Sequence, residues 1–140
     1  MSAHIALIKG DGIGADVCDA TTYLVDLCLR LVGEAPLAIT KIDAGAAYFQ
    51  ETGADIEAGG EDTAGKCDAI FLGAIGLPSI RHPNGTEISP HLRLRERFQL
   101  YAGVRPVKAY PNIPQKLADP RAANIDFIVI RESTEGLFHS

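Results

Sequence analysis

HIALIKGDGIGADVCDATTYLVDLCLRLVG, residues 4–33, is the stretch of sequence that decides the fold. Residues 4–9 are mostly apolar and predict a short buried strand, which the glycine-rich residues 10–14 end. A strand, a tight turn and a helix in this order begin a βαβ unit. Gly33 is placed to end the helix over residues 15–32, whose apolar residues recur at three- and four-residue steps: Val17, Ala20, Leu24, Leu27 and Leu31.

The rest of the chain continues this alternation of strands and helices. The patterns predict strands at residues 37–42, 69–72, 102–108 and 125–131, and helices at 44–51, 56–66 and 91–100. The fold class is therefore α/β, built from βαβ units with a mostly parallel sheet. An apolar strand in such a sheet needs a covering helix. None follows the last strand in this sequence, which predicts a truncated unit.

The charge distribution suits a small anion better than a polyanion. The 140 residues carry a net charge of −5, which argues against general nucleic-acid binding. Residues 1–68 contain twelve acids and four bases, whereas residues 81–108 contain six bases and two acids. The sequence has no secretion signal and no apolar run long enough for a membrane span, and its three cysteines form no CxxC pair. A cytoplasmic protein with no membrane partner is expected.

The glycines of residues 10–14 allow two interpretations. A strand, a glycine loop and a helix can hold a dinucleotide phosphate, but the spacing is GxGxG and Asp11 would repel a phosphate. A tight turn in which backbones approach closely is the alternative.

Arginines are the candidate site residues. Arg95 falls in a predicted helix, Arg105 in the following strand and Arg131 at the end of an apolar strand. Guanidinium groups at such places bind carboxylates through two hydrogen bonds. Each could instead pair with a nearby acid such as Glu132 or Glu96. Arg93 and Arg97 are expected to be solvated, and the histidines His4, His82, His91 and His139 lack metal-ligand spacing.

Three segments resemble the isocitrate/isopropylmalate dehydrogenase family. Residues 5–17 resemble its opening, although the common family form has Pro where this chain has Lys9 and Ala15. Residues 72–78 also fit, and residues 92–136 resemble the substrate-binding stretch from Leu-Arg-Leu-Arg to Arg-Glu-Ser-Thr-Glu-Gly. The resemblance covers essentially the whole chain.

The resemblance implies NAD- or NADP-dependent oxidative decarboxylation of a 2-hydroxy di- or tricarboxylic acid, with Mg2+ or Mn2+ as a Lewis acid. The substrate would be of the isocitrate, 3-isopropylmalate or tartrate/malate type. The family's three substrate arginines match Arg95, Arg105 and Arg131, and its substrate-contacting serine matches Ser89. Glu87 is close to an acid that faces the nicotinamide in some members, with an offset of one residue.

The chain departs from the family at one catalytic position. Phe138 stands where the family usually has a tyrosine, and phenylalanine cannot donate a proton. His139 is a conceivable substitute, although a neighbouring residue on an extended segment points the other way.

The family resemblance also implies that this chain is an amino-terminal fragment with an incomplete isopropylmalate dehydrogenase-like fold. Residues 1–100 would form half of a discontinuous first domain and residues 101–140 would begin the second. No metal ligand is expected in this segment, since the metal ligands would lie after residue 140. The 140-residue chain alone is expected to be inactive, and the full-length protein to be a homodimer. The alternative is a non-catalytic remnant or anion-binding module.

Overall fold

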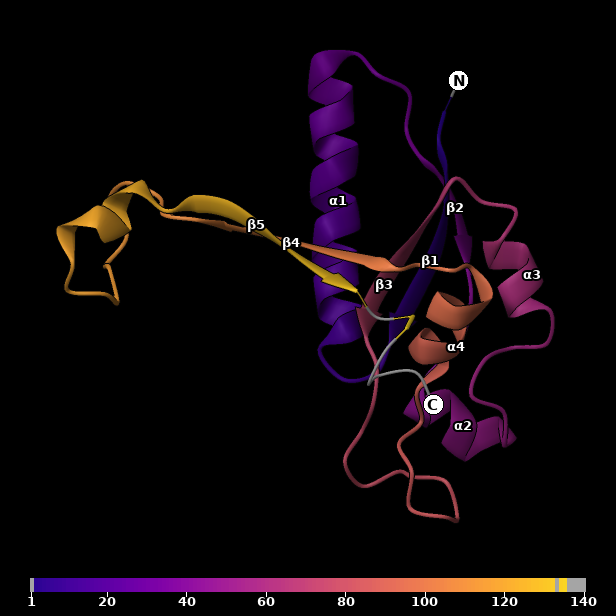
Figure 1. Ribbon diagram of the computed structural model, residues 1–140. Coiled ribbons are helices and arrows are strands. Elements are labelled where there is room, and N and C mark those ends of the chain that lie inside the picture. The colour runs from indigo at the N-terminus through magenta and orange to yellow at the C-terminus, as the bar shows by residue number, and fades with distance from the viewer. Residues whose placement is uncertain (1, 133, 136–140) are drawn as a thin grey trace. The chain divides into compact units, whose positions relative to one another are not determined.

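Three parallel strands form the sheet of the first of two units in this protein. The computed structural model describes residues 2–132 and 134–135, and the chain divides into Met1–Leu94 and Arg95–Ser140. The sheet is formed by β1 (His4–Gly10), β2 (Ala38–Lys41) and β3 (Ala69–Ala74), with β1 in the middle (Figure 1). Both neighbours run parallel to β1. The α/β class predicted from the sequence is confirmed for this unit.

Helices lie on both sides of this sheet. The long helix α1 (Gly14–Val32) packs against β1 and β3, and the short helix α3 (Gly60–Ala64) packs against β1 from the other side (Figure 1). The remaining helices are α2 (Ala46–Thr52) and α4 (Pro90–Arg97). The predicted helix over residues 56–66 was too long. Gly59 has a left-handed backbone with φ of 75°, so α3 begins only after it.

The core of the first unit is built around β1. Ala6 and Ile8 are fully buried, and Ile42 and Ile88 are almost so. A strand buried on both faces is typical of the middle of a parallel sheet. Burial of Ile88 brings the end of the loop over residues 75–89 into this core.

The face of α1 that packs on the sheet is not the apolar stripe of Val17, Leu24 and Leu31. These three side chains are 49%, 55% and 77% exposed. Cys18 is fully buried instead. Its sulfur lies close to β3, since a Cβ on Gly73 would lie 3.0 Å from it. Helix α1 thus has two apolar faces, and only one of them contacts the sheet.

The second unit contains an antiparallel hairpin, which forms a two-stranded sheet of its own. β4 (Ala102–Lys108) and β5 (Asp126–Glu132) pair with each other from Ala102↔Glu132 to Lys108↔Asp126. The covering helix expected after the last strand assumes that this strand belongs to the parallel sheet, whereas β5 pairs antiparallel with β4.

The connection between β4 and β5 contains a 3-10 helix, η1 (Pro120–Asn124). The Asp119 carboxylate caps this helix by accepting a hydrogen bond from the Arg121 backbone N–H, at 2.9 Å. Hydrogen bonds from the Arg121 side chain and backbone hold the pKa of the Asp119 carboxyl below its usual range.

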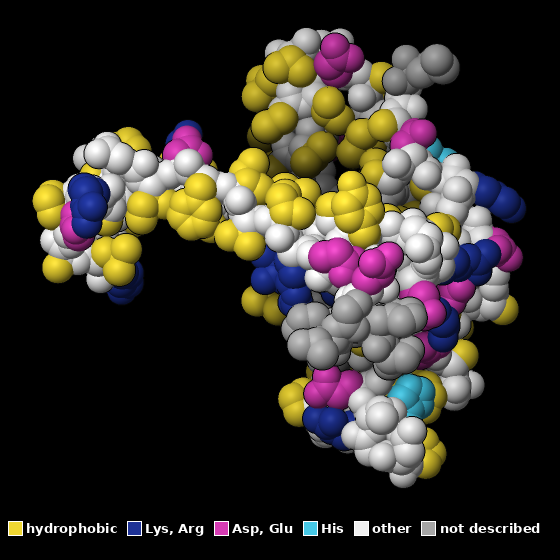
Figure 2. Space-filling model, viewed as in Figure 1, with side chains coloured by type: hydrophobic (Ala, Val, Ile, Leu, Met, Phe, Trp, Pro, Cys, Tyr) yellow, Lys and Arg dark blue, Asp and Glu magenta, His cyan; other side chains and the backbone are white. Residues whose placement is uncertain are grey.

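Apolar side chains lie exposed along the hairpin. Val104, Ile128 and Ile130 are between 58% and 60% exposed on one face, and Phe127 is 50% exposed on the other. Figure 2 shows hydrophobic side chains along the visible side of β4 and β5. Two-stranded hairpins are marginally stable in water without packing on one face. Among the described residues, no helix has the length and apolar character needed to cross a membrane.

Candidate functional site

The glycine-rich turn between β1 and α1 is a site of close backbone approach. A Cβ on Gly10 would lie 2.0 Å from the Ala74 carbonyl oxygen. Cβ atoms on Gly14 and Gly73 would each lie 2.2 Å from the Lys9 carbonyl oxygen. No side chain fits at those distances, so these glycines are needed for β1, α1 and β3 to meet. A tight turn with close backbone approach therefore accounts for the glycines of residues 10–14.

Asp11 is a buried carboxylate in this turn. It is only 3% exposed, and its carboxylate accepts hydrogen bonds from the backbone N–H groups of Ala46, Ala47 and Gly76 at 2.7–2.8 Å. A dinucleotide phosphate binds at the glycine turn and the start of the helix that follows it. A buried negative charge in this turn would repel it, so the turn does not fit a dinucleotide phosphate.

The hairpin brings two of the predicted site arginines to one face. Arg105 pairs with Val129, and Arg131 pairs with Gly103. Directly paired residues of an antiparallel ladder point to the same face, and so do residues two apart on one strand. Arg105 and Arg131 are consequently diagonal neighbours, about 7–8 Å apart. Arg105 is exposed and Arg131 is half-buried.

Gly103 leaves space beside Arg131. It carries no side chain at the position directly opposite this arginine, where an added Cβ would lie 3.6 Å from the Arg131 Cβ. Arg131 therefore has no side chain directly opposite it on this face. Two arginines on one side of a hairpin would suit a ligand with two carboxylates.

The other predicted substrate residues lie on or before α4. Ser89 is half-buried and directly precedes Pro90, the first residue of α4, while Arg95 is exposed on the last turn of that helix. The convergence of Arg95 with the two hairpin arginines stays a prediction. Glu87 is exposed in the loop over residues 75–89, where it forms an ion pair of 3.1 Å with Arg81.

Arg93 differs from the sequence-based expectation of a solvated side chain. Its guanidinium donates to both carboxylate oxygens of Asp55, at 3.0 and 3.1 Å, and to Glu61. Burial opposes its charge, but the hydrogen bonds to Glu61 and Asp55 outweigh this effect and raise the pKa of Arg93. The pairing attaches α4 to α3 and to the segment before it.

We expect Arg93→Ala to destabilise the protein by about 1–2 kcal/mol, less than for a fully buried pair because the arginine side chain is 46% exposed. The loss arises because Asp55 and Glu61, 19% and 17% exposed, would keep their charges but lose the Arg93 guanidinium. Urea denaturation followed by circular dichroism measures it. Arg81→Ala is the control, since its partner Glu87 is 71% exposed. Equal losses in the two variants would contradict the prediction.

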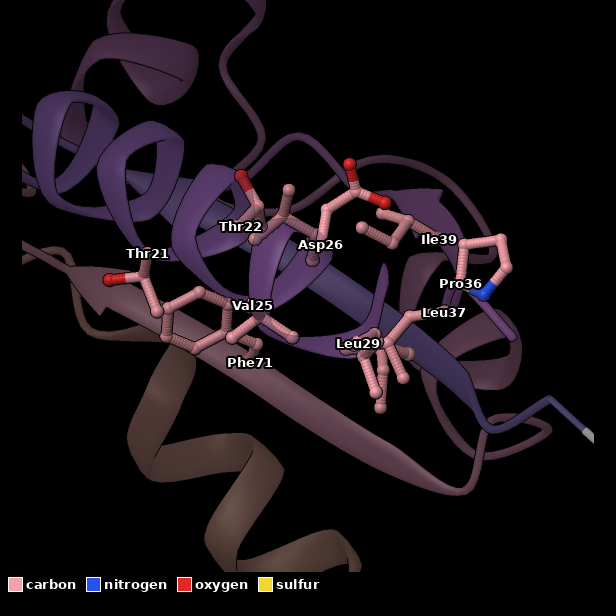
Figure 3. A pocket seen from close by; sticks show the side chains of 11 residues that line it. Thr21, Thr22, Val25, Asp26, Leu29, Pro36, Leu37, Ile39 and Phe71 are labelled. Carbon is pink, nitrogen blue, oxygen red and sulfur yellow. The ribbon is translucent and has the colours of Figure 1, made fainter. Parts of the chain in front are cut away.

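A cavity in the first unit does not suit a polycarboxylate. It has a volume of about 380 Å³ and lies between α1 and the sheet (Figure 3). None of the predicted site residues lines it. Its walls are mostly apolar: Ile5, Leu7, Thr21, Thr22, Val25, Asp26, Leu29, Pro36, Leu37, Ile39 and Phe71. It reflects incomplete filling between α1 and the sheet.

The described part of the chain offers no metal-binding cluster. In residues 2–132 and 134–135, no group of three or more His, Cys, Asp or Glu side chains is placed to hold an ion. The metal that the family resemblance implies therefore has no ligand set among them. Phe138 and His139, the two residues considered for the catalytic proton, lie outside the described residues.

The fold and the glycine turn define an α/β protein whose first unit opens with a strand, a close-packed turn and a helix. The sequence model of the isocitrate/isopropylmalate dehydrogenase family matches residues 4–140. This chain belongs to that family.

Individual relatives agree with this assignment. The chain is 38% identical to a 3-isopropylmalate dehydrogenase of Saccharopolyspora erythraea and 32% identical to a probable tartrate dehydrogenase/decarboxylase of Agrobacterium vitis. The matches cover 95% and 94% of this chain, but only 36% and 37% of those proteins. The chain thus spans little more than a third of the length of these relatives.

Solved structures also match nearly all of this chain over only part of their own length. The crystal structure of the TT0538 protein from Thermus thermophilus superposes with a TM-score of 0.76 at 32% identity, over 98% of this chain and 26% of that one. The isocitrate dehydrogenase of Methylococcus capsulatus superposes with a TM-score of 0.73 at 26% identity, over 99% of this chain and 36% of that one.

Proposed function

We propose that this chain supplies the substrate-binding arginines of an enzyme that oxidises and decarboxylates a 2-hydroxy di- or tricarboxylic acid. NAD or NADP would accept the hydride, and Mg2+ or Mn2+ would act as a Lewis acid on the substrate oxygens. Membership of the isocitrate/isopropylmalate dehydrogenase family supports this proposal, as do relatives named as 3-isopropylmalate and tartrate dehydrogenases.

The observation that carries the proposal is the position of Arg105 and Arg131 on one face of the hairpin, with Gly103 leaving space beside Arg131. Guanidinium groups bind carboxylates through paired hydrogen bonds, and a substrate with two or three carboxylates needs more than one of them. Their charges repel each other when no ligand is bound, so a dianion gains more from this face than a monoanion does.

The other residues have supporting roles in this proposal. Arg95 binds a further carboxylate, Ser89 donates to the substrate and Glu87 faces the nicotinamide. The metal ligands and most of the nucleotide-binding loop would belong to other parts of the family's polypeptide. By family resemblance the working protein is a cytoplasmic homodimer.

The test is reduction of NAD or NADP by the full-length gene product. Isocitrate, 3-isopropylmalate, tartrate and malate are each supplied with Mg2+, and at least one is expected to give turnover. Turnover of none of these acids would overturn the proposal. Binding of an acid to the Arg105–Arg131 face without any cofactor reduction would instead favour the anion-binding module.

A further inference from the structure

The Asp11 carboxylate joins three segments that are far apart in the sequence. It lies in the turn between β1 and α1, and it accepts hydrogen bonds from Ala46 and Ala47 at the start of α2 and from Gly76 after β3. The Asp11 backbone N–H also donates to the Ala74 carbonyl oxygen at 2.7 Å. A buried carboxylate is stable only when hydrogen bonds replace its lost hydration, and three amides do so here.

The backbone around Asp11 is shaped for this contact. A Cβ on Gly45 would lie 2.7 Å from a carboxylate oxygen of Asp11, and Gly45 has φ of 125°, which L side chains rarely adopt. Only glycine lets the start of α2 approach so closely. The contact therefore depends on an aspartate and a glycine that are 34 residues apart.

Helix α2 also holds the loop over residues 75–89 at a second point. The ring of Phe49 in α2 meets the ring of His82 in the loop edge-on, with centroids 4.9 Å apart and planes at 74°. The His82 backbone N–H in turn donates to the Thr86 carbonyl oxygen at 2.9 Å. Asp11 thus acts on the loop directly, through Gly76, and indirectly, by placing the helix that carries Phe49.

We propose that Asp11 is a positioning residue that fixes the loop over residues 75–89, and through it Glu87 and Ser89. The functional role of this loop rests on the proposed function. The hydrogen bonds that join Asp11 to α2 and to the loop, here called the tether, do not. Asp11 touches no substrate in this proposal. Its carboxylate accepts hydrogen bonds from the start of α2 and from Gly76, and these contacts order the loop.

Asp11→Ala is the variant that tests this role. Ala46 and Gly76 donate to one carboxylate oxygen of Asp11 and Ala47 to the other, and a methyl group accepts none of these hydrogen bonds. All three amides therefore lose their acceptor. Asp68→Ala is the matched control, because Asp68 also accepts a backbone N–H, from His4 at 2.8 Å, but is exposed and outside the loop.

The measurement is NMR on the 15N,13C-labelled 140-residue chain. In Asp11→Ala, amide exchange at Gly76 is expected to rise by about tenfold or more. Order parameters should fall over residues 77–86, and the His82 ring protons should lose the shift caused by Phe49. Amides of β1 and β3 should stay protected, and Asp68→Ala should leave the loop unchanged. Unchanged loop order in Asp11→Ala would overturn the proposal.

A second measurement needs no variant. Scalar couplings across hydrogen bonds, from the amides of Ala46, Ala47 and Gly76 to the Asp11 carboxyl carbon, are expected in the wild-type chain. If they are absent, these hydrogen bonds do not exist and the proposal fails, even where Asp11→Ala does not fold. Both measurements are made without a ligand. Failure of the full-length enzyme to turn over any acid would therefore overturn the proposed function and leave the tether standing.

Discussion

A Gly14→Ala chain is expected to lose the fold of the unit Met1–Leu94. The added Cβ would lie 2.2 Å from the Lys9 carbonyl oxygen and 2.7 Å from the Ala74 nitrogen. Alanine favours a helix over glycine by about 1 kcal/mol, which would stabilise α1. The clash outweighs this gain, because relieving it separates β1 from β3 and costs more than about 4 kcal/mol. That is a large part of the roughly 5–15 kcal/mol that holds a domain together.

Gly12→Ala is the matched control in the same turn. No heavy atom lies within 4 Å of a Cβ built on Gly12, but its φ is +52°. Only the left-handed backbone is then strained, at about 1–2 kcal/mol. Urea denaturation of the two variants, followed by far-ultraviolet circular dichroism, separates clash from strain. Equal midpoints for Gly12→Ala and Gly14→Ala would show that the close approach does not exist.

Arg131→Ala is expected to weaken binding of the acid that the full-length enzyme turns over by on the order of 100-fold. The variant removes one of two charged donor groups from the hairpin face that also carries Arg105. Arg131→Lys should recover only part of the loss, because an ammonium group keeps the charge but not the paired hydrogen bonds. Calorimetry at fixed low ionic strength measures the dissociation constants.

Lys108→Ala supplies the comparison for a cation lost from the same hairpin. Lys108 points to the opposite face and pairs with Asp126 at 2.8 Å. Its removal should change the dissociation constant by less than about threefold, as for an exposed ion pair. If Lys108→Ala weakens binding as much as Arg131→Ala, net charge rather than the arginine face holds the substrate.

The sequence predicted the elements better than their pairing. Glycines and apolar periodicity are local signals, and they located β1, α1 and the left-handed Gly33 that ends the helix. Strand direction is not local. An apolar strand such as β5 has the same pattern whether it pairs in parallel or antiparallel, so the pattern could not separate the hairpin from the parallel sheet. The face of α1 was ambiguous for a related reason, since both of its faces are apolar.

The candidate site shows the same division. The sequence motifs indicated Arg105 and Arg131 as candidate site residues, and the hairpin register places both on one face. The contacts of Asp11 and Arg93 could not be predicted, because their partners lie 32 to 65 residues away along the chain. An aspartate between two glycines directly after a strand was the one available hint. Taken alone, it argues only against phosphate binding.

The close packing around Gly10, Gly14 and Gly73 changes what the opening motif of such sequences means. These positions leave no space for a methyl group, and the aspartate between the first two is taken up by internal hydrogen bonds. Selection for folding alone is then enough to preserve them. A gene copy that had given up its reaction would still carry this signature. In genome surveys it therefore marks ancestry and architecture, and it does not by itself indicate activity.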